Sequence, residues 1–273
     1  MSPLQPAPPS RVYRFPRLPF MRWLVDLLLG RPRSFARDSR VTLDGNPPSP
    51  CVQGLDHLPP EGPFILVMNH YERGGLPIHF CAMAVSLAVA GRRPRSPEIR
   101  WVITSEWYGR HIGPLPIPVS LIRWVFRRVS RLYGLIVMPR AAGHTRGRAA
   151  AIRRLAQDVR AGESVALVPE ALGKGTLIEA MPGSGLALLA LSRGRLPIVP
   201  VGLWEDDATL MVRFGETFTL TLEAGATSRE EQDRQARERV MVAIGRLLPQ
   251  RYWGFYAPAI GRELEGQQRE PAE

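Results

Sequence analysis

The stretch FILVM at residues 64–68, followed at once by Asn69 and His70, decides the fold class of this chain. An uninterrupted apolar run of this length is typical of a buried strand. After a short loop, residues 77–90 (PIHFCAMAVSLAVA) are apolar enough to form a helix that packs against a core. A strand, a loop and a helix in this order are the repeating unit of an α/β protein.

The same alternation continues along the chain. Further strands are predicted at residues 100–104, 135–138, 164–168 and 198–203, and helices at residues 145–161, 186–193 and 228–248. Gly162 directly follows the first of these helices and favours its end there. We therefore expect an α/β fold, with a largely parallel central sheet flanked by helices and an amphipathic helical segment near the N-terminus.

Length and composition favour a single domain. A chain of 273 residues with 45% hydrophobic residues can bury one sizeable core. Residues 1–50 are expected to form a proline-rich arm and an amphipathic membrane-docking segment. Residues 51–257 are expected to form the main domain, and residues 258–273 a polar tail.

Charge and cysteine content restrict the partners and the compartment. The formal net charge is +11 and the pI is near 10.8, so we expect an anionic partner. No RNA-binding or DNA-binding motif with interleaved aromatic residues accompanies this charge, and no nucleic-acid partner is expected. Cys51 and Cys81 have neither metal-ligand spacing nor a disulfide framework, which fits a reducing compartment.

Two segments favour contact with an anionic membrane surface. Residues 18–29 (LPFMRWLVDLLL) predict a short, mostly apolar helix. In residues 119–133 apolar side chains recur at helical spacing, while Arg123, Arg127 and Arg131 follow at four-residue steps on another face. An ordinary core-packing helix with a solvated arginine face explains the second segment at least as well. Because no apolar run reaches the length that spans a bilayer, we expect a peripheral or monotopic protein on the cytoplasmic face.

His70 is the first candidate for chemistry. A side chain just past the carboxyl end of a strand lies where α/β folds build their sites. An imidazole there can act as a general base at neutral pH. A turn histidine with no chemical role is the alternative, and the local pattern does not decide between them.

Four segments, in order, carry a resemblance to a known family. They are GLDHLP at residues 54–59, with the strand and His70 that follow, GLIVMPR at 134–140, VPEALGKGT at 168–176 and LPIVPV at 196–201. Together they resemble the glycerolipid acyltransferases of the 1-acylglycerol-3-phosphate type, over residues 54–218. The loop MPGSG at residues 181–185 is similar to a further loop of that family.

The resemblance implies a reaction and a set of residues. It implies acyl transfer from a thioester, on coenzyme A or acyl carrier protein, to a hydroxyl of a lysophospholipid or glycolipid. His70 would be the general base, without a covalent enzyme intermediate, and Arg140, Glu170 and Lys174 would hold the acceptor. A structural salt bridge is the alternative for Arg140, and a loop-fixing carboxylate is the alternative for Glu170. Neither a metal nor a cofactor is implied.

One position departs from the family pattern. The family has an aspartate that orients its catalytic histidine, and the corresponding residue here is Gly75. Glu72 is the nearest replacement, provided that the segment after His70 is not a regular helix. Glu106 or a backbone carbonyl could serve instead, and Glu72 could equally be a solvated loop carboxylate. A catalytically impaired lipid-binding protein of the same fold therefore stays open as the second hypothesis.

The string GKGT at residues 173–176 is similar to part of a phosphate-binding loop. Such a loop needs a glycine six positions before its lysine, and that position is Val168. ATP binding is therefore not expected.

Overall fold

The computed structural model of the chain describes residues 11–104, 111–112, 115–116, 118–138, 145–173, 175–222, 225 and 228–269. Its main feature is a seven-stranded sheet in the order β1-β9-β8-β2-β7-β3-β6. The strands of this sheet are β1 Cys51–Gln53, β2 Ile65–Met68, β3 Arg100–Thr104, β6 Ile136–Met138, β7 Val165–Leu167, β8 Ile198–Asp206 and β9 Thr209–Phe214. Neighbouring strands are parallel except β8 and β9. The predicted largely parallel α/β sheet is confirmed.

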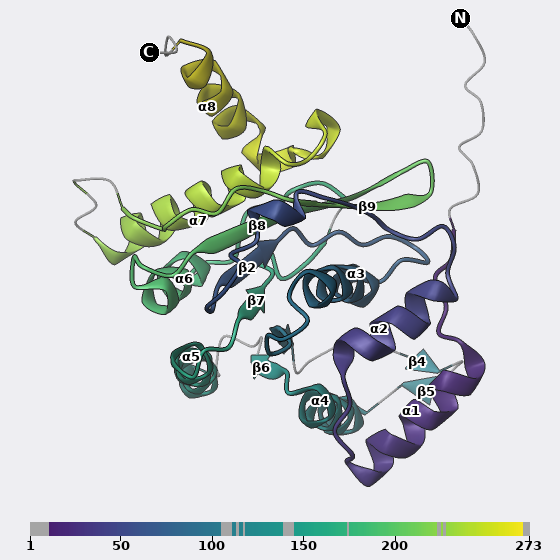
Figure 1. Cartoon of the computed structure of the whole chain (residues 1–273). Coiled ribbons are helices and arrows are strands. Elements are labelled where there is room, and N and C mark those ends of the chain that lie inside the picture. The colour runs from purple at the N-terminus through teal and green to yellow at the C-terminus, as the bar shows by residue number, and fades with distance from the viewer. Residues whose placement is uncertain are drawn as a thin grey trace, which may run out of the picture.

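Helices cover the sheet on both sides. They are α1 Arg17–Leu29, α2 Phe35–Asp44, α3 Ile78–Arg92, α4 Val119–Tyr133, α5 Thr145–Arg160, α6 Ser184–Ser192, α7 Arg229–Gly245 and α8 Ala257–Arg269. Figure 1 shows α1, α2 and α3 gathered on one side of the sheet, with α6 and α7 along the other and α8 projecting from the body. Short 3-10 turns lie at Leu55–His57 (η1), Gln250–Tyr252 (η2) and Gly254–Tyr256 (η3), and a separate two-stranded ribbon pairs β4 (His111–Ile112) with β5 (Leu115–Pro116).

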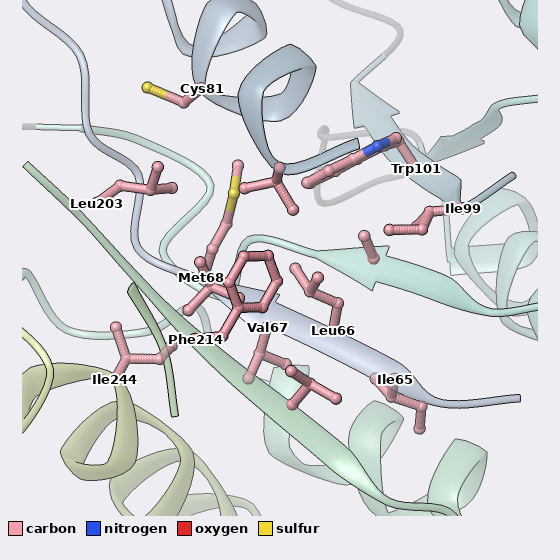
Figure 2. Packing of buried hydrophobic residues seen from close by; sticks show 14 of the residues in the cluster. Ile65, Leu66, Val67, Met68, Cys81, Ile99, Trp101, Leu203, Phe214 and Ile244 are labelled. Atoms are coloured by element: carbon pink, nitrogen blue, oxygen red, sulfur yellow. The ribbon is translucent and has the colours of Figure 1, made fainter. Parts of the chain in front are cut away.

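Strand β2 forms the centre of the core. It pairs with β7 on one side and β8 on the other, and its four side chains are completely buried. Figure 2 shows these side chains packed among Phe214, Ile244 and Trp101, which come from β9, α7 and β3. An apolar run without alternation is what a strand buried on both faces requires. The residues after Met68 therefore emerge from the most firmly packed part of the molecule.

The boundaries predicted from the sequence hold within a few residues, but several elements were not predicted. They include β1, α2, β9 and α8. Helix α2 begins after Ser34, whose hydroxyl accepts a hydrogen bond from the Arg37 amide at 3.0 Å and so caps the helix. Strand β9 shows the alternating burial of a strand with one covered face.

The C-terminal segment differs from the polar tail expected after residue 257. It is helical up to Arg269, and Ile260 is completely buried. The reason is a close contact with Gly245 of α7, since a Cβ on that glycine would lie 2.3 Å from the Ile260 Cδ1 atom. The missing side chain thus leaves room for Ile260, and Leu264 of the same helix also packs against the core.

Candidate active site

The carboxyl end of β2 is fixed by the side chain of Asn69. Its amide nitrogen donates to the Leu203 carbonyl at 2.9 Å, and its amide oxygen accepts from the Leu203 amide at 2.8 Å. Asn69 is buried, so both bonds are shielded from water. They continue the pairing of β2 with β8 by one residue and define where His70 leaves the sheet.

The segment that follows His70 is not helical. Residues 69–72 form an irregular loop, and Arg73 and Leu76 then exchange two backbone hydrogen bonds at 3.2 and 3.0 Å across a tight turn. The helix α3 begins only at Ile78. Glu72 could partner His70 only if the segment after the histidine were not a regular helix. The observed backbone meets that condition.

Glu170 joins the segment at residues 168–176 to His70. One carboxylate oxygen accepts from the His70 backbone amide at 2.6 Å, and the other accepts from the Ile178 amide at 2.8 Å. The residue is only 1% exposed. This geometry matches the alternative role of Glu170 as a loop-fixing carboxylate. The role of Glu170 in holding an acceptor stays a prediction.

Burial changes the protonation of Glu170. Desolvation raises the pKa of its carboxyl from 4.5 to about 7, against the two backbone N–H donors, which lower it. A carboxyl with a raised pKa in the folded state contributes stability that is present below the unfolded value and is lost as the pH rises through the folded value. The window for this group is therefore pH 4.5 to 7.

We expect the free energy of unfolding of the wild type to fall across that window by a contribution on the order of 3 kcal/mol from Glu170. Glu170→Gln does not titrate and should lack this part of the slope. Urea unfolding at several pH values measures it, with Glu61→Gln as the control because Glu61 is exposed. Equal slopes in the wild type and Glu170→Gln would contradict the raised pKa.

Gly173 packs directly on His70 and Glu72. A Cβ on this glycine would lie 2.5 Å from His70 Nδ1, 2.5 Å from the His70 carbonyl oxygen and 2.9 Å from Glu72 Cγ. His70 Nδ1 and the Glu72 side chain thus both lie close to the position that a Cβ on Gly173 would occupy. The structure therefore brings together His70 and Glu72, two of the predicted site residues, and encloses them with the loop after Glu170.

Gly75 has a backbone conformation that disfavours any side chain. Its φ is +82°, and a Cβ would lie 3.1 Å from both the Arg11 carbonyl oxygen and Val12 Cα. An aspartate at this position would be strained and would also collide with the N-terminal segment. The glycine is thus built into the turn and cannot be exchanged for the expected aspartate without rearrangement.

Two further residues hold the turn, and the sequence analysis did not identify them. Arg73 forms a paired salt bridge with Glu205 of β8, in which Nη2 donates to Oε1 at 2.5 Å and Nε donates to Oε2. The Tyr71 hydroxyl lies 3.4 Å from the same carboxylate, and Tyr252 donates to the Glu205 carbonyl at 3.2 Å. Arg73 and Glu205 are 132 positions apart, so no local sequence pattern could have indicated that they pair.

The loop MPGSG is capped by an aspartate from α7. Asp233 accepts from the amides of Gly183 and Leu186, both at 2.9 Å, at the start of α6. Arg237 pairs with the same carboxylate at 3.0 Å. Asp233 thus satisfies two of the backbone amides at the start of α6.

Other predicted site residues lie outside the described part of the chain. These are Arg140, Lys174 and Glu106. Their predicted roles are neither supported nor opposed by the geometry. Within the described ranges, no group of three His, Cys, Asp or Glu side chains could hold a metal ion.

One hollow on the described surface lies away from His70. Its volume is about 500 Å³, and its walls include His57, Pro60, Pro197 and Glu216. Pro60 precedes β2 and Pro197 precedes β8, so this hollow lies at the amino ends of the strands. His70 lies at the opposite, carboxyl edge, where parallel sheets place their sites.

Comparisons with known proteins add little to this geometry. No protein-family model matches the chain, and no curated protein matches it. Among solved structures, it is similar to the 1-acyl-sn-glycerophosphate (LPA) acyltransferase PlsC from Thermotoga maritima, with 15% sequence identity and a TM-score of 0.45. The match covers 93% of this chain and 91% of that chain. A likeness of this size assigns neither a family nor an activity to the protein.

Proposed function

We propose that this protein transfers a fatty acyl group from an acyl thioester to a hydroxyl of a lysophospholipid or related glycerolipid at a membrane surface. One observation carries the proposal. Two of the segments that resemble glycerolipid acyltransferases, separated by 100 residues, meet at His70 through Glu170 and Gly173. This meeting at the carboxyl edge of a parallel sheet supports a catalytic role for the histidine.

The proposed reaction needs one base and no metal or cofactor. His70 takes the proton from the acceptor hydroxyl while the hydroxyl oxygen attacks the thioester carbonyl. The carbon–sulfur bond then breaks, and the departing thiolate receives a proton from the imidazolium. Glu72 stabilises that imidazolium as a nearby negative charge, in place of the family's aspartate. Arg140 and Lys174 remain our proposed ligands for an anionic acceptor headgroup.

Helix α1 is the proposed membrane-docking element. Six of its large apolar side chains are more than 40% exposed: Leu18, Phe20, Met21, Val25, Leu28 and Leu29. Exposed arginines accompany this surface on α1 and on the neighbouring α4: Arg17, Arg22, Arg123, Arg127 and Arg131. Apolar side chains inserted between headgroups, with cations beside them, suit an anionic bilayer. No described helix is both long and apolar enough to cross a membrane.

Leu18→Glu combined with Leu28→Glu should lower binding to vesicles of phosphatidylcholine and phosphatidylglycerol by about tenfold or more, because two charges would enter the apolar layer. Vesicle co-sedimentation measures this. Phe255→Glu is the matched control: Phe255 is 60% exposed, on η3, which contacts α8, far from α1 in Figure 1. An equal loss in the control would argue against docking through α1.

A lipid-binding protein without turnover is the second candidate. Gly75 favours it, because the residue that would orient the imidazole is absent at that position. Such a protein would bind lysolipid or acyl-CoA and release no thiol. The joint presence of His70, Arg140 and Glu170, three residues that the resemblance assigns to the site, supports the enzyme instead.

The test is acyl transfer by the purified protein on vesicles, with radiolabelled acyl-CoA or acyl carrier protein as donor and a panel of lysolipids and glycolipids as acceptors. Labelled ester with at least one acceptor supports the enzyme, and the panel identifies that acceptor. Saturable lysolipid binding without ester formation, from either donor, would replace the proposal with the second candidate.

A further inference from the structure

Residues 11–15, termed the strap below, cross the tight turn that follows Glu72. The Tyr13 amide donates to the Gly75 carbonyl at 2.7 Å. In the other direction, Arg73 Nη1 donates to the Arg11 carbonyl at 2.7 Å. Two hydrogen bonds thus join the strap to the turn across more than 60 positions of sequence.

The strap occupies the space that a side chain at position 75 would fill. A Cβ on Gly75 would meet Val12 Cγ2 at 3.0 Å and the strap backbone at 3.1 Å. Gly74, the preceding residue, has open space at the same place. A side chain would therefore collide with the strap at Gly75, whereas a side chain at Gly74 would meet no other atom.

The strap is itself firmly anchored. Tyr13 is 5% exposed, with its ring centre 5.2 Å from that of Phe80 on α3. The Arg14 amide donates to Asn46 Oδ1 at 2.9 Å, and Asn46 Nδ2 donates back to the Arg14 carbonyl at 2.8 Å. A segment tied to the core on both sides can hold the turn in place.

The turn is clamped from the other direction as well. Arg73, which binds the strap carbonyl, also forms the paired salt bridge with Glu205 of β8. Glu72 immediately precedes Arg73 in the chain. Its Cγ and His70 Nδ1 both lie close to the position that a Cβ on Gly173 would occupy. The strap and Glu205 thus fix the turn just where it leaves Glu72.

We infer that the strap and Glu205 are positioning elements that hold Glu72 against His70, in place of an aspartate carried by the turn itself. The inference rests on the proposed function. It accounts for Gly75, because the strap can cross the turn only where no side chain stands. A turn held by outside contacts can orient a carboxylate as firmly as a residue of the turn could.

The test compares matched variants in the acyl-transfer assay. Gly75→Ala should lower kcat by about tenfold to a hundredfold with an unchanged KM for the acceptor, because small misplacements of a catalytic group have effects of that size. Gly74→Ala should keep the wild-type kcat. Tyr13→Ala should act like Gly75→Ala, and Tyr13→Phe should rescue it, since no described group hydrogen-bonds the buried Tyr13 hydroxyl.

A double-mutant cycle separates positioning from general support of the fold. In the Glu72→Gln background, Gly75→Ala and Tyr13→Ala should lower kcat no further, because the group that they position is already lost. Full additivity of the two losses would overturn the inference, as would wild-type kcat in both Gly75→Ala and Tyr13→Ala.

Hydrogen exchange tests the strap independently of turnover. Amides in residues 70–76 should exchange at least tenfold faster in Tyr13→Ala than in the wild type, and at the wild-type rate in Tyr13→Phe. Equal protection in all three proteins would overturn the inference whether or not the protein is an enzyme. Faster exchange in a protein that transfers no acyl group would support the strap's hold on the turn and refute the proposed function instead.

Discussion

His70→Ala is expected to lower kcat for acyl transfer by about 10²-fold to 10⁴-fold, the range that a general base contributes. The acceptor hydroxyl is a weak nucleophile at neutral pH, and the described site has an imidazole at the carboxyl end of β2 to activate it. Because the role of His70 lies in the transition state, KM for the acceptor should change little. Steady-state kinetics on mixed vesicles measure both quantities.

His57→Ala is the control for this prediction. His57 lies at the amino edge of the sheet, where its Nδ1 is 3.0 Å from the Phe214 carbonyl, and should not affect turnover. The far-ultraviolet circular dichroism of His70→Ala should match that of the wild type. A folded variant that retains wild-type kcat would remove His70 from the mechanism.

Gly173→Ala is expected to reduce kcat by about a hundredfold, although the change adds only one methyl group. The new Cβ would lie 2.5 Å from both Nδ1 and the carbonyl oxygen of His70, so the imidazole or the loop after Glu170 must move. The backbone of Gly173 does not have a positive φ, so the expected effect is steric. Kinetics together with the crystal structure of the variant would reveal the displacement.

The matching control is Gly91→Ala in α3, where an added Cβ meets no atom within 4 Å. It should retain the wild-type kcat and gain slight stability. If Gly173→Ala also kept the wild-type kcat in a folded protein, the loop after Glu170 would have no part in positioning His70.

Much of the fold could be predicted from local pattern. The apolar run at residues 64–68 predicted β2, and the arginine-bearing periodicity at 119–133 predicted α4 within its observed bounds. Strand β9 was harder to predict, because Met211 interrupts the alternation of apolar and polar residues in its sequence, and its alternating burial appears only in the structure. Ser34 could have signalled the start of α2 as an N-cap residue.

The site could be predicted only in part, because its geometry depends on long-range contacts. His70 and Glu170 were both identified, but the hydrogen bond between them spans 100 positions and appears in no local spacing. The pairing of Arg73 with Glu205 and the crossing of Gly75 by the strap are of the same kind. The sequence showed only that Gly75 stands where the family has an aspartate. The structure shows that a side chain at this position would collide with the strap.

The most direct test of the proposed function follows thiol release and ester formation together, in the wild type and in His70→Ala, on vesicles with acyl-CoA and lysophosphatidic acid or the acceptor identified by the panel. The account predicts equal amounts of free thiol and new acyl ester from the wild type, and neither above background from the variant. Ester formation at the same rate in His70→Ala would contradict it, as would a folded, lipid-bound wild type that forms no ester with any acceptor.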